Sequence, residues 1–238
     1  MKLKNWVLVF IIGSFIYACG SAGDETPDPP LDPDLGKSYY FLVEGKYREY
    51  NVYEIRYDAV GSDTSRYQIR EEIGSSFMSG GHESHIVNRF KRDNSTQPWE
   101  LDSVWTARIE TDKAVSIENN VPVVKMTFPA DTSRRWDGNF YNGQEPRIQR
   151  LKNFNSSFTV GLNTFLRTAE VELSNDDDFF TFRDVRTEVY RDSIGLIYRD
   201  YVVVGFCNRR DDPCYGQRVI TSGRLYREEL YAHGFIDE

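Results

Sequence analysis

Residues 47–57 read Tyr-Arg-Glu-Tyr-Asn-Val-Tyr-Glu-Ile-Arg-Tyr, and the turn-forming residues Gly61-Ser62-Asp63 follow them closely. The large side chains of one parity in this stretch are Tyr47, Tyr53, Ile55 and Tyr57. Alternate residues of an extended strand point to the same face, so this pattern predicts a half-buried strand that ends in a hairpin.

The same alternation recurs along the chain, in residues 99–109, 124–128 and 169–173. Between such runs lie short segments rich in Gly, Asn, Asp and Ser, which favour turns over helix caps. These are Ser79-Gly80-Gly81, Glu118-Asn119-Asn120, Gly161-Leu162-Asn163 and Asn175-Asp176-Asp177. The pattern predicts an all-β, mostly antiparallel domain of ten or more strands, with one helical turn at residues 145–154. A sheet of that size must curl, so we expect a single curved sheet, an incomplete barrel or a sandwich.

The composition supports this fold class. Of 238 residues, 14% are aromatic, and 8 Ala stand against 19 Val and 15 Tyr, which favours strands over helices. There are 29 Lys and Arg against 37 Asp and Glu, for a net charge of -8. A nucleic-acid-binding protein needs a basic face to displace the counterions of phosphate, so we expect no nucleic-acid partner.

Residues 1–18 have the pattern of a secretory signal peptide, with Lys2 and Lys4 ahead of an uncharged run of 12 residues, Trp6 to Tyr17. That run is shorter than the about 20 helical residues needed to span a bilayer. Its end, Ala18-Cys19-Gly20, resembles the lipobox of bacterial lipoproteins. The resemblance implies cleavage before Cys19 and lipid attachment to its sulfur. The alternative is an ordinary signal peptide with an incidental cysteine.

Residues 19–36 differ from the rest of the chain, because they contain several acidic residues and prolines and no basic residue. Such a segment is typical of an extended tether, with a reach of roughly 50 to 60 Å. Residues 37–238 then form one β-rich domain. Gly20 is not the aspartate that retains some lipoproteins in the inner membrane, and Asp24-Glu25 resembles surface-export signals. We therefore expect a lipid anchor at the outer membrane of a Gram-negative bacterium, facing either the periplasm or the cell surface.

Cys207 and Cys214 flank the polar hexapeptide Asn-Arg-Arg-Asp-Asp-Pro between two strand-like runs, Tyr201 to Phe206 and Tyr215 to Ile220. Compartments outside the cytoplasm permit disulfides, and two thiols without a nearby histidine are too few ligands for structural zinc. The spacing therefore favours a disulfide over a metal site.

Three further segments resemble those of uncharacterised Bacteroidota envelope lipoproteins. They are Tyr39 to Tyr50, with an aromatic pair, Gly45 and Tyr50; Trp136-Asp137-Gly138-Asn139; and Gly195-Leu196-Ile197-Tyr198, after Val189-Tyr190. The resemblance implies a β-rich envelope lipoprotein and provides no activity to transfer. In the Trp136 segment, the glycine and asparagine suit a turn and the tryptophan suits an anchor against a sheet, which we prefer to a sugar-stacking role.

Candidates for chemistry are few. His82-Glu83-Ser84-His85 is one residue short of the zinc motif His-Glu-x-x-His, and its spacing on a strand sends the two rings to opposite faces. His233 has no evident partner in the sequence. Asp176-Asp177-Asp178 and Asp211-Asp212 lack the glycine and distal glutamate of a calcium-binding EF-hand loop, so we interpret them as solvated turns.

These observations predict no catalytic residue, cofactor or metal. We expect a non-catalytic lipoprotein whose β domain binds or scaffolds a protein or small molecule, anchored to the membrane through Cys19. Two alternatives are open: a carrier that shelters a lipid or other apolar ligand in the curved sheet, and a glycan-acting hydrolase that uses two loop carboxylates.

Overall fold

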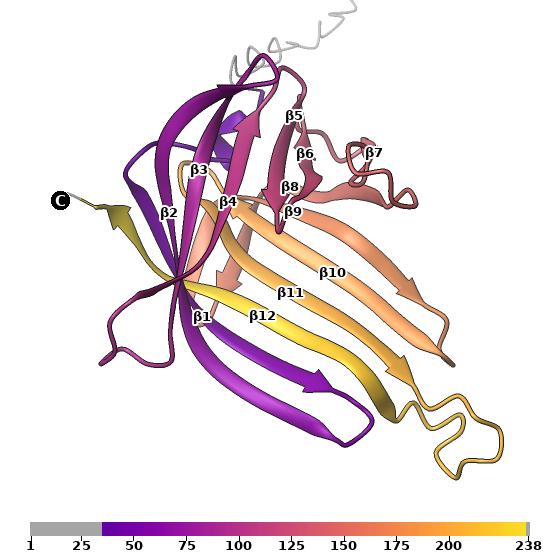
Figure 1. The fold of residues 1–238 in the computed structure, drawn as a ribbon. Helices are drawn as coiled ribbons and strands as arrows, with labels where there is room; N and C mark the ends of the chain where they lie inside the picture. The colour runs from indigo at the N-terminus through magenta and orange to yellow at the C-terminus, as the bar shows by residue number, and fades with distance from the viewer. Residues whose placement is uncertain (1–34, 237–238) are drawn as a thin grey trace, which may run out of the picture. The chain divides into compact units, whose positions relative to one another are not determined.

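The computed structural model describes residues 35–236, which form a single antiparallel sheet of twelve strands preceded by one short 3-10 helix, η1 (Lys37–Tyr39) (Figure 1). The first six strands are β1 (Lys46–Tyr57), β2 (Ser62–Ser79), β3 (His82–Arg92), β4 (Glu100–Ile109), β5 (Lys113–Glu118) and β6 (Val121–Thr127). The last six are β7 (Arg135–Asp137), β8 (Ile148–Val160), β9 (Asn163–Asp177), β10 (Phe182–Arg191), β11 (Gly195–Phe206) and β12 (Ile220–Phe235). The all-β prediction is confirmed, and of its variants the single curved sheet, rolled into a nearly closed barrel, is the one observed.

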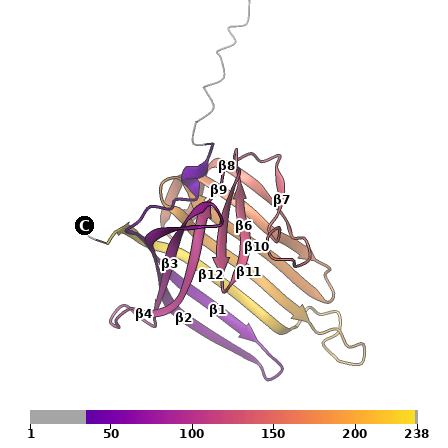
Figure 2. The ribbon, with the colours of Figure 1, turned by 45° about the horizontal axis from the view of Figure 1, so that its top comes forward.

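The strand order is β6-β5-β4-β3-β2-β1-β12-β11-β10-β9-β8-β7. The chain therefore makes two meanders of neighbouring hairpins, which join where the first strand pairs with the last. Lys46 of β1 lies opposite Phe235 of β12, and Tyr57 lies opposite Gly223. Figure 2 shows the two meanders curling toward each other.

The two edge strands meet through a few contacts. The backbone N–H of Val124 in β6 donates to the carbonyl of Gly138, just after β7, at 2.9 Å. The indole Nε1 of Trp136 donates to the carbonyl of Val124 at 3.2 Å and to Oε1 of Gln149 at 3.0 Å. Sheets of this size curl and avoid free edges, and this seam is where the curling ends.

One end of the rolled sheet is filled by the segment that leads into β1. Tyr39 and Tyr40 are buried in the core, and the Tyr39 ring lies 5.0 Å from that of Phe154. The carbonyl of Leu35 accepts a hydrogen bond from Ala130 at 2.9 Å, which ties the start of the described chain to the β6–β7 connection. The other end carries the β1–β2 hairpin, the β9–β10 turn and the β11–β12 loop, and it is open.

Two sequence predictions need correction. Residues 145–154 form no helical turn, because Ile148–Val160 is strand β8, paired with β7 and β9. Asn175-Asp176-Asp177 is the end of β9, and the turn begins one residue later. Within residues 35–236 no helix has the length and hydropathy needed to cross a membrane.

Candidate functional site

The inner face of the rolled sheet is rich in charged residues. In β1 the buried positions alternate, and they are Lys46, Arg48, Tyr50, Val52 and Glu54. The tyrosines and isoleucine that marked this strand in the sequence have the other parity, and they lie half-exposed on the outer face. Because buried charges are costly unless they are paired, the partners of these side chains determine what the interior can do.

Eight charged side chains of the interior, four cations and four glutamates, form one alternating series, which we call the ion-pair chain. Its contacts are Arg48–Glu71 (3.3 Å), Glu71–Arg89 (3.1 Å), Arg89–Glu228 (2.8 Å), Glu228–Arg199 (2.8 Å), Arg199–Glu188 (3.0 Å), Glu188–Lys125 (2.8 Å) and Lys125–Glu118 (2.9 Å). Each inner member has an opposite charge on both sides. Because the four cations and four glutamates are equal in number, the series is electrically neutral.

Two of these contacts cross the interior between strands that are not neighbours in the sheet. Arg89 of β3 reaches Glu228 of β12, although β2 and β1 lie between these strands. Lys125 of β6 reaches Glu188 of β10, which connects the regions near the two edges. The ion-pair chain therefore braces the rolled sheet from inside.

Tyrosine hydroxyls donate further hydrogen bonds to the buried glutamates. Tyr190 donates to Oε2 of Glu188 at 2.5 Å, Tyr201 donates to Oε1 of the same residue, and Tyr226 donates to Glu228. Burial, together with the adjacent glutamates, raises the pKa of Tyr190 and Tyr226 well above the usual 10.0. These phenols therefore remain protonated hydrogen-bond donors.

The same contacts keep the glutamates ionised. Burial alone raises the pKa of Glu188, but Lys125, Arg199 and the hydrogen bond from Tyr190 outweigh burial and lower it. For Glu228, whose side chain is 0% exposed, Arg199 and Arg89 overcome the effect of burial in the same way. A carboxyl group held this way is a poor proton donor at neutral pH.

Beyond the ion-pair chain, at the open end, lies a cavity of about 680 Å³, which we call the polar cavity. Arg89, Arg199 and Glu118 of the ion-pair chain line this cavity. Its aromatic lining includes Trp105, Tyr67, Tyr201 and Tyr226. A smaller cavity of about 240 Å³ shares Glu118, Asn119 and Tyr201 with it. The volume of the polar cavity is within the range of small-molecule sites, but its wall is more charged than the apolar lining that is typical of them.

Glu54 organises one side of the polar cavity. Its side chain is 3% exposed, and its Oε1 lies 2.6 Å from Nε of Arg56 and 2.7 Å from Nε of Arg224, while Tyr67 donates to Oε2 at 2.8 Å. Burial raises the pKa of Glu54, but the hydrogen bonds from Tyr67 and Arg56 and the charge of Arg224 outweigh burial and lower it. The ionised Glu54 therefore holds the side chains of Arg56, Arg224 and Tyr67 in place.

Cations of the wall lie over aromatic rings. The shortest cation-to-centroid distances are 3.9 Å for Arg89 over Trp105, 4.0 Å for Arg224 over Tyr226 and 4.2 Å for Lys91 over Tyr67. Such contacts stabilise a charge without consuming its hydrogen-bond donors. The cationic side chains are held in place with donors to spare.

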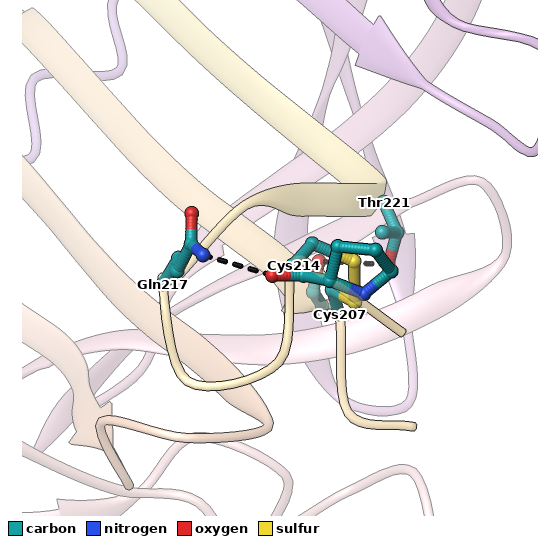
Figure 3. Close-up of a disulfide and its surroundings, with 6 residues drawn as sticks. Cys207, Cys214, Gln217 and Thr221 are labelled. Carbon is teal, nitrogen blue, oxygen red and sulfur yellow. Dashed lines mark hydrogen bonds between the residues drawn. A yellow bond between two sulfur atoms is a disulfide. The ribbon is translucent and has the colours of Figure 1, made fainter. Parts of the chain in front are cut away.

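The predicted site residues lie elsewhere. Cys19 is outside the described residues. Cys207 and Cys214 form a disulfide, with a Cα–Cα distance of 5.9 Å, in the loop between β11 and β12 (Figure 3). Inside this loop Gln217 donates to the carbonyl of Pro213 at 2.8 Å. The disulfide braces the open end and is not part of the polar cavity's wall.

The histidines form no cluster. His82 is exposed at the β2–β3 hairpin, Nδ1 of His85 lies 3.4 Å from the carbonyl of Gly74, and His233 is near the end of β12. Among residues 35–236, the one group of His, Cys, Asp and Glu compact enough for an ion is Cys207, Asp212 and Cys214, and its two sulfurs are already bonded to each other.

The acidic run 176–178 acts within its turn. Oδ1 of Asp178 accepts hydrogen bonds from the backbone N–H groups of Phe180, Thr181 and Phe182, at 2.7–3.0 Å. Asp177 accepts a hydrogen bond from Nη2 of Arg218 at 2.8 Å, which links the β9–β10 turn to the β11–β12 loop. These carboxylates are occupied by local structure.

The Trp136 segment lies at the seam. Oδ1 of Asp137 accepts the backbone N–H groups of Asn139 and Arg147 at 2.8 and 2.9 Å, so the segment forms a tight turn beside β6. The ring of Trp136 is buried, which agrees with the anchoring role and leaves no face free for a sugar.

The sequence alone does not reveal the ion-pair chain or the polar cavity. A signal was present in β12, where Glu228 lies two residues from each of the large side chains Tyr226 and Leu230. A charge at the parity of core residues indicates a buried partner. The partner itself is 139 positions away, at Arg89, and a strand pattern cannot reveal it.

Comparison with known proteins gives likenesses of fold only. No protein-family model matches the chain, and no curated protein matches it. Among solved structures, an inferred exported protein with a YmcC-like fold from Bacteroides fragilis is 11% identical, with a TM-score of 0.45 over 82% of this chain and 98% of that one. An inferred lipoprotein from Parabacteroides distasonis is 10% identical, with a TM-score of 0.42 over 82% and 98%. A lipoprotein-sorting domain from Vibrio parahaemolyticus gives a TM-score of 0.22 at 10% identity, over 85% of this chain and 91% of that one.

Proposed function

We propose that this chain is a non-catalytic, lipid-anchored binding protein of the bacterial cell envelope, and that the polar cavity is its binding site. The observation that carries the proposal is the combination of a 680 Å³ cavity with walls fixed by buried ion pairs. Binding sites work best when their polar groups are held in position before the ligand arrives.

The buried glutamates argue against a hydrolase whose acid lies inside the rolled sheet. A glycosidase needs one carboxyl group with a raised pKa to protonate the leaving group. Glu54, Glu118, Glu188 and Glu228 are bound to cations, and each has a lowered pKa. None of these four glutamates is suited to be that acid.

The wall of the polar cavity also disfavours the carrier of an apolar ligand. Its charged residues include Arg56, Arg89, Lys91, Arg199 and Arg224, and a lipid tail would have to displace water from them without returning a hydrogen bond. The site therefore favours a polar ligand. Native mass spectrometry of the protein isolated from its producing bacterium tests this, with a bound polar molecule expected. A co-purified fatty acid or neutral lipid would instead support the apolar carrier.

The anchor in this proposal is Cys19, exposed when residues 1–18 are removed, with residues 19–36 as the tether and the outer membrane as the site of attachment. Cells fed labelled palmitate should yield labelled protein, because each buried methylene of an acyl chain contributes about 0.8 kcal/mol to membrane attachment and two or more chains hold a protein stably. The Cys19→Ser variant should remain unlabelled, and Cys207→Ser, which changes a cysteine of the folded domain, should keep the label. Label retained by Cys19→Ser would refute the anchor. In a separate experiment, protease treatment of intact cells distinguishes a domain on the cell surface from one in the periplasm.

A further inference from the structure

Two arginines on the wall of the polar cavity share a single carboxylate. Arg56 of β1 and Arg224 of β12 are directly opposite each other in the register, a placement in which like charges repel. Both are held by the same oxygen of Glu54, at 2.6 and 2.7 Å, and the other oxygen of Glu54 accepts the hydroxyl of Tyr67. The two cations therefore share one oxygen of Glu54, and Asp63, opposite Arg56 in the register of β2, is a second, exposed carboxylate on this side of the cavity.

The donors of these arginines are mostly unused. A guanidinium has five N–H donors, and Glu54 engages only the Nε of each. Within residues 35–236, the Nη atoms of Arg56 and Arg224 have no acceptor in the protein, and the two side chains are 68% and 44% exposed. Lys91 of β3 lies over the ring of Tyr67 and has no carboxylate within ion-pair distance in the same range.

Five cations line the cavity with four carboxylates, so cations are in slight excess. Glu118 is paired with Lys125 at 2.9 Å. Asp63, opposite Arg56 in the register of β2, and Asp102, which accepts from Ser103 at 3.0 Å, are exposed residues that form no ion pair within 4.0 Å in the described part of the chain.

A further donor belongs to a residue that lines the same cavity. The indole Nε1 of Trp105 is buried and has no hydrogen-bond acceptor among the described residues. Trp105 lines both the polar cavity and the small space of about 40 Å³ beneath it. An indole N–H can only donate, so it adds to the excess of donors over acceptors.

We propose that the polar cavity binds an oxyanion, a phosphate or carboxylate group, between Arg56, Arg224 and Lys91. The inference rests on the proposed function and names the ligand class of the same site. Guanidinium groups match the paired oxygens of these anions, and such charge-assisted hydrogen bonds are roughly twice as strong as neutral ones. The group belongs either to a soluble small molecule or to a lipid headgroup, since both present the same oxygens.

The test uses the full-length lipidated protein in a neutral detergent, titrated calorimetrically with pyrophosphate, with citrate and with uncharged maltotriose. We expect the two anions to bind and the sugar not to bind. Losing one charge-assisted hydrogen bond costs enough to weaken binding about tenfold, so Arg56→Gln and Arg224→Gln should each raise the dissociation constant by about that factor. The matched control is Arg227→Gln, which removes the same charge from β12 at a residue paired with Asp200 outside the polar cavity. It should bind like the wild type.

A second arm identifies the source of the anion. The same protein is placed in nanodiscs of phosphatidylcholine with or without phosphatidylglycerol, and quenching of tryptophan fluorescence is followed. A response to phosphatidylglycerol that Arg56→Gln abolishes assigns the site to a lipid headgroup, whereas binding of soluble anions alone assigns it to a small molecule. Binding of maltotriose alone would overturn the oxyanion proposal and leave the binding function standing. The absence of any binding, with no ligand found by native mass spectrometry, would overturn both.

Discussion

At the scale of single residues, Glu228 is a buried member of the ion-pair chain that holds two arginines. It is fully buried, it bridges Arg89 and Arg199 at 2.8 Å each, and it accepts the hydroxyl of Tyr226. Glu228→Gln leaves two buried guanidinium groups short of charge, so we expect it to lower the free energy of unfolding by about 3–5 kcal/mol. Urea denaturation at pH 7 measures this. Asp200→Asn, in the exposed pair with Arg227, is the control and should cost less than about 1 kcal/mol.

The buried glutamates also predict how stability depends on pH. Glu118, Glu188 and Glu228 have folded-state pKa values below their usual 4.5. A depressed pKa contributes stability above the unfolded-state value, and this contribution is lost as pH falls toward the folded-state value. We therefore expect the free energy of unfolding to decline below about pH 4.5. His233, whose pKa is lowered from 6.5 by burial and by Lys46 and Arg191, adds a loss in the same direction. Equal stability at pH 6 and pH 3 would contradict this prediction.

At the scale of elements, the seam depends on a residue without a side chain. A Cβ added to Gly138 would lie 1.9 Å from Nε2 of Gln149, whose side chain is buried and accepts the indole N–H of Trp136. Gly138→Ala must displace that side chain, and we expect a cost of about 1–3 kcal/mol, as for other overpacked sites. Thermal unfolding measures it. Gly74→Ala in β2, where the nearest atom would be 3.5 Å away, is the matched control and should be close to neutral.

Strands are also where the sequence was most informative. Alternating residues located β1, β4, β6 and β9, and the glycine-rich and asparagine-rich turns located four hairpins, because both signals are local. The inner face of β1 could not be identified this way. Its tyrosines point outward and its Arg48 and Glu54 point inward, since the partners that make those charges tolerable come from β2, β3 and β12.

The proposed binding site could not be predicted from the sequence, for a related reason. Arg56 and Arg224 are far apart in the sequence, and only the pairing of the first strand with the last brings them to one carboxylate. Composition gave a net charge of -8 and did not indicate that five cations would line one cavity. By contrast, Cys207 and Cys214 are seven positions apart, so their bond depended on nothing distant.

At the scale of the whole molecule, the sheet should open at its seam first. The edges β6 and β7 meet through few hydrogen bonds, whereas β1 and β12 are paired along both sides and contribute the fully buried Tyr50 and Glu228. We expect amides of β6 and β7 to exchange with deuterium well before those of β1 and β12, because local opening follows the density of buried contacts. Exchange at one uniform rate, read by mass spectrometry of peptic fragments, would contradict this.

The pairing of the first and last strands has a consequence for how the protein folds during its synthesis. During synthesis the chain emerges amino end first, so β1 is complete early, but one edge of β1 stays unpaired until the sixteen residues of β12 follow. Until then the two halves are separate ribbons with bare edges, the state most prone to pair with another copy. A premature stop before Ile220 would therefore leave the two halves without the strand that joins them.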